Sequence, residues 1–189
     1  HWMVHSFPTR RSSDLLGPLT AAGAAAAARL GAEATVASLP GLAAAAAGVA
    51  AAGAPLRVHL KVETGVNRQG LVEDELPAAL AVLAGAPGLR LAGLSSHFAD
   101  IEDTTDHAFA RAQMARFEAW RQRLAEHGHA DLCHHMSCSA AALLWPESHR
   151  LLARVGVSAY GLWPSRESRV SARAAGTGEL PLRPALTWI

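Results

Sequence analysis

The hydrophobic positions of the chain fall into short apolar runs that alternate with longer stretches of helical periodicity from about residue 16 onward. The clearest helical stretch covers residues 106–128, where large apolar side chains recur three or four positions apart. They are Met114, Phe117, Trp120 and Leu124. The apolar runs predict strands over residues 34–38, 56–64, 89–98, 131–139 and 153–161. Strands that alternate with helices are typical of βα units around a parallel sheet.

Polar residues follow each of the last four predicted strands. They cover residues 63–68, 95–97, 137–139 and 160–161. Parallel barrels and doubly wound sheets carry their chemistry at the carboxyl ends of the strands. We therefore expect these polar side chains to converge on one rim of the sheet.

Composition narrows the class of partner. The 189 residues are 50% hydrophobic and 17% charged, which is typical of a soluble globular domain. A net charge of +1 provides no field that would favour nucleic acid or an anionic membrane, so we expect a small-molecule or protein partner.

The alanine-rich runs are broken by glycine and contain no span of bulky apolar residues long enough for a membrane helix. The two cysteines, Cys133 and Cys138, argue against a disulfide scaffold and suit a reducing cytoplasm.

The first 15 residues differ in composition from the alanine- and leucine-rich chain that follows. Residues 6–15 read SFPTRRSSDL, which matches one reading frame of a widely used sequencing-adapter oligonucleotide. We expect residues 1–15 to be an artefact that replaces a lost N-terminal part. A disordered basic tail is the alternative interpretation. We expect the chain to be cut at its other end as well.

Four segments in chain order carry a resemblance to one known family. They read VHLKVETGVNRQG at residues 58–70, LSSHFAD at 94–100, SCSAAAL at 137–143 and RVGVSAYGLWPS at 154–165. In this order and with these gaps they resemble alanine racemase, a pyridoxal-phosphate enzyme of the fold-type-III barrel. The segment LRPALTW at 182–188 resembles the start of that family's C-terminal β-domain.

The resemblance implies a fold and a function. The fold is an α/β, parallel (β/α)8 TIM-type barrel, incomplete, with about the last five βα units in residues 16–180 and the start of a C-terminal β-domain in residues 181–189. The full-length parent is expected to be a cytoplasmic homodimer that interconverts L- and D-alanine with pyridoxal 5'-phosphate and so supplies D-alanine for peptidoglycan. Two alternatives stay open: a noncatalytic barrel that binds pyridoxal phosphate, and a related racemase or decarboxylase acting on another amino acid.

Three residues are implied by the resemblance to act on the cofactor or the substrate. Arg68 matches the arginine that contacts the cofactor's phenolic oxygen and helps to hold the substrate carboxylate. Arg154 matches the arginine that faces the pyridine nitrogen. His97 matches the histidine in the hydrogen-bond chain from that arginine to the second catalytic base.

Two further implied features concern the phosphate and a lysine. Ser139, with the backbone amides of Gly156 and Val157, matches the phosphate cradle; for Ser139, an ordinary helix N-cap is the alternative. Lys61 is the only lysine of the chain and matches a lysine that is carbamylated in some family members, where it orients the nearby arginine. The alternative is an ion pair between Lys61 and Glu63, which share one face of a predicted strand.

The sequence also departs from the family pattern. Glu63 stands where the family usually has aspartate, and Cys138 stands where it usually has asparagine. The Schiff-base lysine has no match in the chain, and Tyr160, the sole tyrosine, does not match the second base. We therefore expect the 189-residue fragment to be inactive. The run CHHMSC at 133–138 could suggest zinc, but alternation along a strand sends neighbouring side chains to opposite faces, so we expect no metal site.

Overall fold

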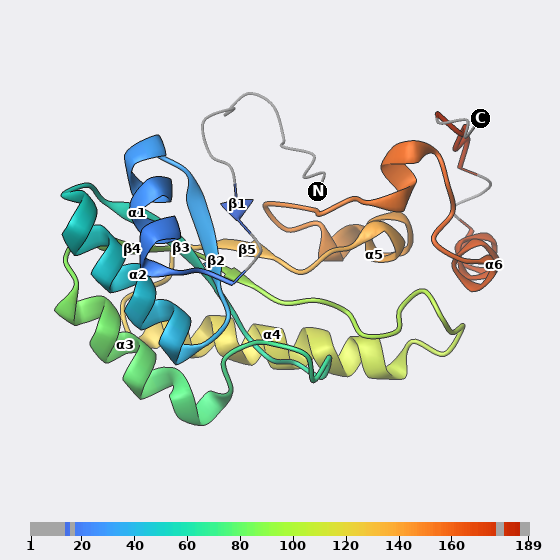
Figure 1. Cartoon of the computed structure of the whole chain (residues 1–189). Coiled ribbons are helices and arrows are strands. Elements are labelled where there is room, and N and C mark those ends of the chain that lie inside the picture. Colours follow the sequence, from blue (N-terminus) through green and yellow to red (C-terminus); the bar gives the residue numbers. More distant parts are fainter. Residues whose placement is uncertain (1–13, 16–17, 177–179, 186–189) are drawn as a thin grey trace.

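The computed structural model describes residues 14–15, 18–176 and 180–185 (Figure 1). Its centre is one sheet whose strands run parallel and follow each other in chain order. The strands are β1 (Asp14–Leu15), β2 (Glu33–Val36), β3 (Leu56–Lys61), β4 (Leu89–Ser95) and β5 (Cys133–His135). Sequential parallel strands with helical crossovers are the repeating unit of a βα barrel.

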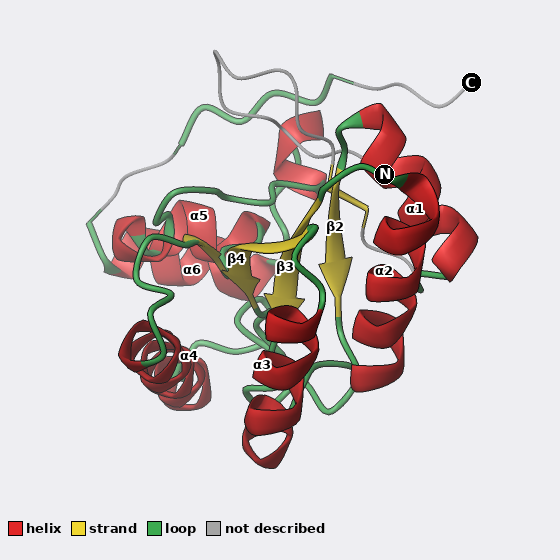
Figure 2. Ribbon diagram, turned by 90° about the vertical axis from the view of Figure 1, so that its left-hand side faces the viewer, coloured by secondary structure: helices red, strands yellow, loops and turns green. Residues whose placement is uncertain are grey.

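Helices follow the strands and cover one face of the sheet (Figure 2). They are α1 (Ala21–Leu30), α2 (Leu39–Ala52), α3 (Leu76–Gly85) and α4 (Ala108–Glu126). Beyond β5 lie the shorter helices α5 (Ser139–Leu144) and α6 (Arg166–Ala174) (Figure 1). Three 3-10 helices complete the described chain: η1 (Glu73–Glu75), η2 (Pro146–Ser148) and η3 (Val157–Tyr160).

The ends of α1 and α2 show why these alanine-rich segments fold as separate helices. Each begins at a hydroxyl N-cap, where Thr20 and Ser38 accept hydrogen bonds from the backbone N–H three residues on. Each ends at a glycine in the left-handed conformation, Gly31 and Gly53. Small side chains also let the two helices approach closely, since a Cβ on Gly48 would lie 2.6 Å from the carbonyl oxygen of Ala21.

Alternation along β3 separates the core from the functional face. Leu56, Val58 and Leu60 are buried in the hydrophobic core that the helices cover. His59 and Lys61 occupy the intervening positions and therefore point to the opposite face. Parallel pairing aligns Lys61 with Ser95, and Ser95 with His135, so the ends of three strands lie in one line.

Four of the five predicted strands are confirmed in shortened form, and the predicted helix over 106–128 is confirmed as α4. The prediction of a strand over 153–161 is wrong. This segment pairs with no described strand and forms η3 instead, because its amides bind Ser139 and carbonyls of the same turn.

The predicted domain boundaries at 15 and 180 stay predictions. Residues 14–15 form β1, which pairs with β2, while residues 1–13 and 16–17 lie outside the described chain. Residues 180–185 contain no strand, and 186–189 lie outside the described part. None of the helices in the described ranges has the length and apolar character needed to cross a membrane.

Candidate functional site

A cavity of about 260 Å³ opens at the carboxyl ends of the strands. It brings together four residues singled out from the sequence, namely Lys61, Arg68, His97 and Arg154. The remaining lining residues are Thr35, Gln69, Ser95, Ser96 and His135. Three of the nine side chains are cations and none is acidic, which favours an anionic ligand.

Arg154 reaches the cavity from the irregular segment between η2 and η3. Its backbone N–H donates to the carbonyl of Ser137 at 3.0 Å, which fixes the start of this segment beside β5. Its guanidinium donates through Nη1 to Nδ1 of His135 and, at 3.1 Å, to the carbonyl of the same residue. Through Nη2 it donates to the carbonyl of Ser96 at 2.5 Å and reaches Nδ1 of His97 at 3.4 Å. The planar fork thus spans the ends of β4 and β5 in one orientation.

His97 is neutral in this environment. Burial and then the neighbouring charges of Arg154, Lys61 and Arg68 together lower its pKa to about 4. Because Arg154 donates toward Nδ1, a neutral His97 carries its proton on Nε2. The imidazole therefore accepts from Arg154 on one side and offers a donor on the other.

Lys61 lies among cations at the end of β3. Burial lowers the pKa of its amine, and Arg68 and Arg154 lower it further, while Glu63 acts in the opposite direction. The alternative interpretation of a Lys61–Glu63 ion pair is not supported, because no such salt bridge forms among the described residues. The Glu63 carboxylate instead accepts from the backbone N–H of Gly65 at 2.5 Å.

Glu63 shapes the loop that carries Arg68. Burial raises the pKa of its carboxyl, but hydrogen bonds from backbone amides of residues 64–67 outweigh burial and lower it overall. The loop closes where the N–H of Leu71 donates to the carbonyl of Lys61 at 2.8 Å. Gly70, at φ 149°, allows this return, since a Cβ there would lie 2.6 Å from the backbone nitrogen of Glu63.

Helix α4 anchors both loops that border the cavity. The fully buried Gln113 donates to the carbonyl of His97 at 3.1 Å and accepts from the N–H of Ala99 at 3.0 Å. Arg116 donates to the carbonyl of Thr64 at 2.8 Å. The functional loops are thus held by a helix as well as by the strands.

Ser139 forms a second polar cluster with the segment that follows Arg154. Its hydroxyl accepts from the N–H of Gly156 at 2.9 Å and from that of Ser158 at 3.4 Å. The expected helix begins at Ser139, but its N-cap is Cys138, so the interpretation of Ser139 as an ordinary N-cap is wrong. The second amide that reaches the hydroxyl is that of Ser158, whereas the resemblance had implied Val157.

The family model described as "Alanine racemase, N-terminal domain" matches residues 10–164. The chain belongs to this family. It is 35% identical over 132 residues to an alanine racemase of Leptospira interrogans, covering 70% of this chain and 34% of that protein. It is 39% identical over 127 residues to an alanine racemase of Desulfosudis oleivorans, covering 62% and 32%. The chain therefore spans about a third of the length of these curated relatives.

Solved structures of alanine racemases share the fold. That of Bacillus anthracis, solved with bound L-Ala-P, superposes with a TM-score of 0.79 at 27% identity and covers 92% of this chain and 44% of that one. That of Streptomyces coelicolor gives 0.73 at 29% identity, over 86% and 42%. The expectation of an incomplete alanine racemase barrel is confirmed.

His135 is the main site residue of this alanine racemase family member that the sequence reasoning missed. In the sequence it stands out only as part of the CHHMSC run, whose pattern could suggest a metal ligand. The same alternation that separates His134 from His135 places His135 on the cavity face, so the signal was present. No group of three or more potential metal ligands occurs in the part of the chain that the structure describes.

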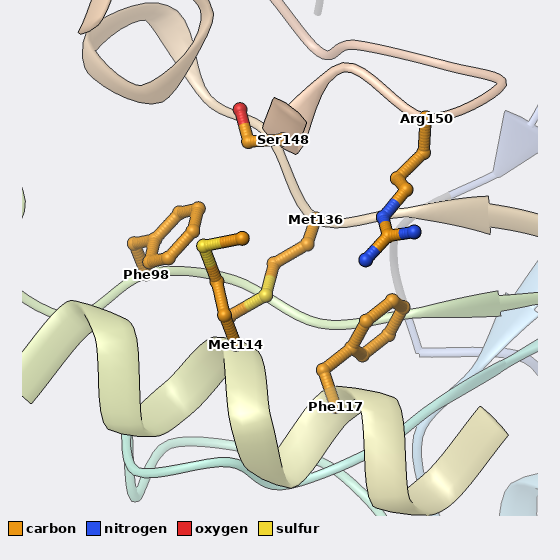
Figure 3. A pocket seen from close by; sticks show the side chains of 6 residues that line it. All are labelled: Phe98, Met114, Phe117, Met136, Ser148 and Arg150. Carbon is orange, nitrogen blue, oxygen red and sulfur yellow. The ribbon is translucent and has the colours of Figure 1, made fainter. Parts of the chain in front are cut away.

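A separate small pocket lies between α4 and the segment after β5 (Figure 3). The side chains of Met114 and Met136 meet inside it, and Phe98 and Phe117 flank them. These side chains are part of the apolar packing under α4, which agrees with the core stripe expected from the sequence. This pocket is a packing feature and lies outside the cavity that holds the charged residues.

Proposed function

We propose that this chain forms the cofactor-binding part of an alanine racemase that interconverts L- and D-alanine with pyridoxal 5'-phosphate. The observation that carries the proposal is the fixed Arg154 guanidinium on the wall of a cavity that Lys61 and Arg68 also line, in a chain of the alanine racemase family. The relatives named above are alanine racemases, which supports alanine as the substrate. The cytoplasmic homodimer that the resemblance implies is part of the same proposal.

The residues present fit the cofactor's anionic groups. Ser139 with the amides of Gly156 and Ser158 would hold the phosphate, because a hydroxyl and two N–H groups converge there. Arg154 would face the ring nitrogen. Pyridoxal phosphate, when bound, supplies the electron sink that makes the α-proton of an amino acid acidic.

Side chains of this protein would then bind the substrate and orient the groups that act on it. Arg68, exposed at the mouth of the cavity, would hold the substrate carboxylate. His97 would keep its proton on Nε2 and connect Arg154 to a catalytic base. Lys61, whose pKa is lowered by burial and by the two arginines, would react as the neutral amine with dissolved CO2 and release one proton to give a carbamate, whose negative charge pairs with Arg68.

The catalytic bases are not provided by the 189 residues. Lys61 and Tyr160 are the single lysine and tyrosine, and neither matches the family's bases. We therefore expect no racemisation by the 189-residue chain mixed with alanine and cofactor. Turnover by the purified chain would contradict this expectation.

Equilibrium binding of pyridoxal phosphate, followed by tryptophan fluorescence, tests the proposal. We expect saturable binding that Ser139→Ala and Arg154→Ala each weaken by about tenfold, the effect of losing one charge-assisted hydrogen bond. Arg29→Ala is the matched control, since it removes an exposed cation at the end of α1. Absence of binding by the unsubstituted chain, or equal binding by all variants, would overturn the proposal. Activity of the gene product on a panel of amino acids would distinguish alanine from another substrate and racemisation from simple cofactor binding.

A further inference from the structure

A chain of hydrogen bonds leads away from the cavity through the interior of the sheet. The guanidinium of Arg154 contacts Nδ1 of His135, and Nε2 of His135 lies 2.7 Å from Nδ1 of His59. Nε2 of His59 lies 2.5 Å from Oε2 of Glu33. His59 is 3% exposed and His135 is fully buried, so water does not compete for these contacts.

The chain of hydrogen bonds takes its residues from β2, β3 and β5. It can pass β4 because that strand has no side chain between the two histidines. His59 lies on β3 and His135 on β5, while Gly93 of β4 is paired with His59. A Cβ on Gly93 would overlap the His59 ring at Nδ1. In barrels, inward side chains from alternate strands meet in layers, and the glycine permits that meeting here.

The geometry fixes which atom donates and which accepts in every hydrogen bond from Arg154 to Glu33. Arg154 can only donate, so Nδ1 of His135 must be the acceptor and its proton must lie on Nε2. That proton is donated to Nδ1 of His59, whose own proton therefore lies on Nε2 and is donated to Glu33. A His59 protonated on both nitrogens would force His135 to present N–H to Arg154, donor against donor.

We propose that Glu33 and His59 are positioning residues that hold His135 in the tautomer that accepts from Arg154, with Gly93 as the residue that makes room for them. Arg154, which can only donate, sets the direction at one end, and the Glu33 carboxylate, which accepts at the far end, pairs the last N–H and so stabilises the same direction. His135 in turn aims the Arg154 guanidinium along the wall of the cavity. The inference goes beyond the proposed function, because it concerns the tautomers of two buried histidines, which exist whether or not a cofactor binds.

Nitrogen-15 NMR of the imidazole rings in the 189-residue chain tests the proposal without any cofactor. In the unsubstituted protein, His59 and His135 should each give one pyridine-type Nδ1 and one pyrrole-type Nε2 signal. Glu33→Ala leaves the buried Nε2–H of His59 without an acceptor, which penalises the arrangement that Arg154 favours, so both rings should lose this single-tautomer signature. Glu33→Gln keeps an acceptor oxygen and should restore it.

Arg57→Ala is the matched control. Arg57 also binds Glu33, at 2.7 Å, but its side chain is 59% exposed and it lies outside the chain of imidazoles. It should leave both tautomers unchanged. Gly93→Ala should disturb the tautomers as Glu33→Ala does, by displacing the His59 ring.

Two outcomes would overturn the proposal: the opposite tautomer of His135 in the unsubstituted protein, or unchanged tautomers in Glu33→Ala.

A second readout concerns the cavity: Glu33→Ala should weaken pyridoxal phosphate binding by about tenfold, while binding of inorganic phosphate stays unchanged. Equal affinity of Glu33→Ala and the unsubstituted protein for pyridoxal phosphate would contradict the link to Arg154. If the unsubstituted protein binds no pyridoxal phosphate, the proposed function fails, and the tautomers still decide the present inference.

Discussion

Moderate acid should destabilise this protein through two histidines of the site. Burial, followed by the charge of Arg154, lowers the pKa of His135 to about 2 and that of His97 to about 4, from the ordinary value of 6.5. The unfolded chain therefore binds protons more readily than the folded one. The stability that depends on neutral histidines is complete above pH 6.5 and is lost as the pH falls from 6.5 toward the folded-state pKa values.

The size of the effect follows from the width of this window. Each unit of pH below the ordinary pKa lowers the free energy of unfolding by about 1.4 kcal/mol per neutral histidine. At pH 5 each histidine has therefore lowered it by up to about 2 kcal/mol, and the pair by up to about 4 kcal/mol. Glu33, whose pKa its hydrogen bond with His59 lowers to about 2, loses its contribution only below pH 4.5 and does not contribute in this range.

Urea unfolding of the 189-residue chain at a series of pH values from 8 to 5 measures the effect. His97→Gln and His135→Gln each remove one titrating ring, so each should reduce the pH-dependent loss by up to about 2 kcal/mol, whatever it does to stability at pH 8. The reasoning fails if the free energy of unfolding is constant over this range, or if both variants retain the full pH dependence.

Three further predictions follow from packing and from the cavity. Gly48→Ala should lower the free energy of unfolding by about 1–3 kcal/mol, because its Cβ would press on α1, whereas Gly85→Ala meets open space and should be neutral or slightly stabilising in the same urea titration. Trp120→Ala should lower the free energy of unfolding by about 3–5 kcal/mol, since the ring is 2% exposed in the core under α4; a loss below about 1 kcal/mol would contradict the burial. In ¹³C-bicarbonate, Lys61 should give a carbamate carbonyl signal that Lys61→Arg abolishes; no signal in the unsubstituted protein would refute the modification.

Local patterns were sufficient to predict most of the fold. The α4 stripe of Phe117, Trp120 and Leu124 follows from helical spacing and lies in the core. The error over 153–161 has a physical cause: its valines and tyrosine have strand propensity, but a strand needs a neighbour, and these amides bind Ser139 and nearby carbonyls instead. Propensity alone cannot show whether a pairing partner exists.

The candidate site was predictable only at the ends of the strands. Lys61, Arg68, His97 and Arg154 lie in recognisable segments and meet in one cavity. His59 lies in mid-strand, two positions before Lys61, where an isolated histidine is easily assigned to packing. Its partners come from β2 and β5, and their contact depends on register, which the sequence does not show.

The same face of β3 serves two purposes, and this explains the place of the single lysine. Lys61 ends the strand at the cavity, while His59, two residues earlier, lies one layer deeper and joins the chain from Glu33 to His135. The buried core positions on either side of His59, Val58 and Leu60, fix the register of β3 and so the positions of both side chains. A one-residue shift of β3 would turn both Lys61 and His59 toward the helix-covered core, so packing on one face of the strand maintains the chemistry on the other.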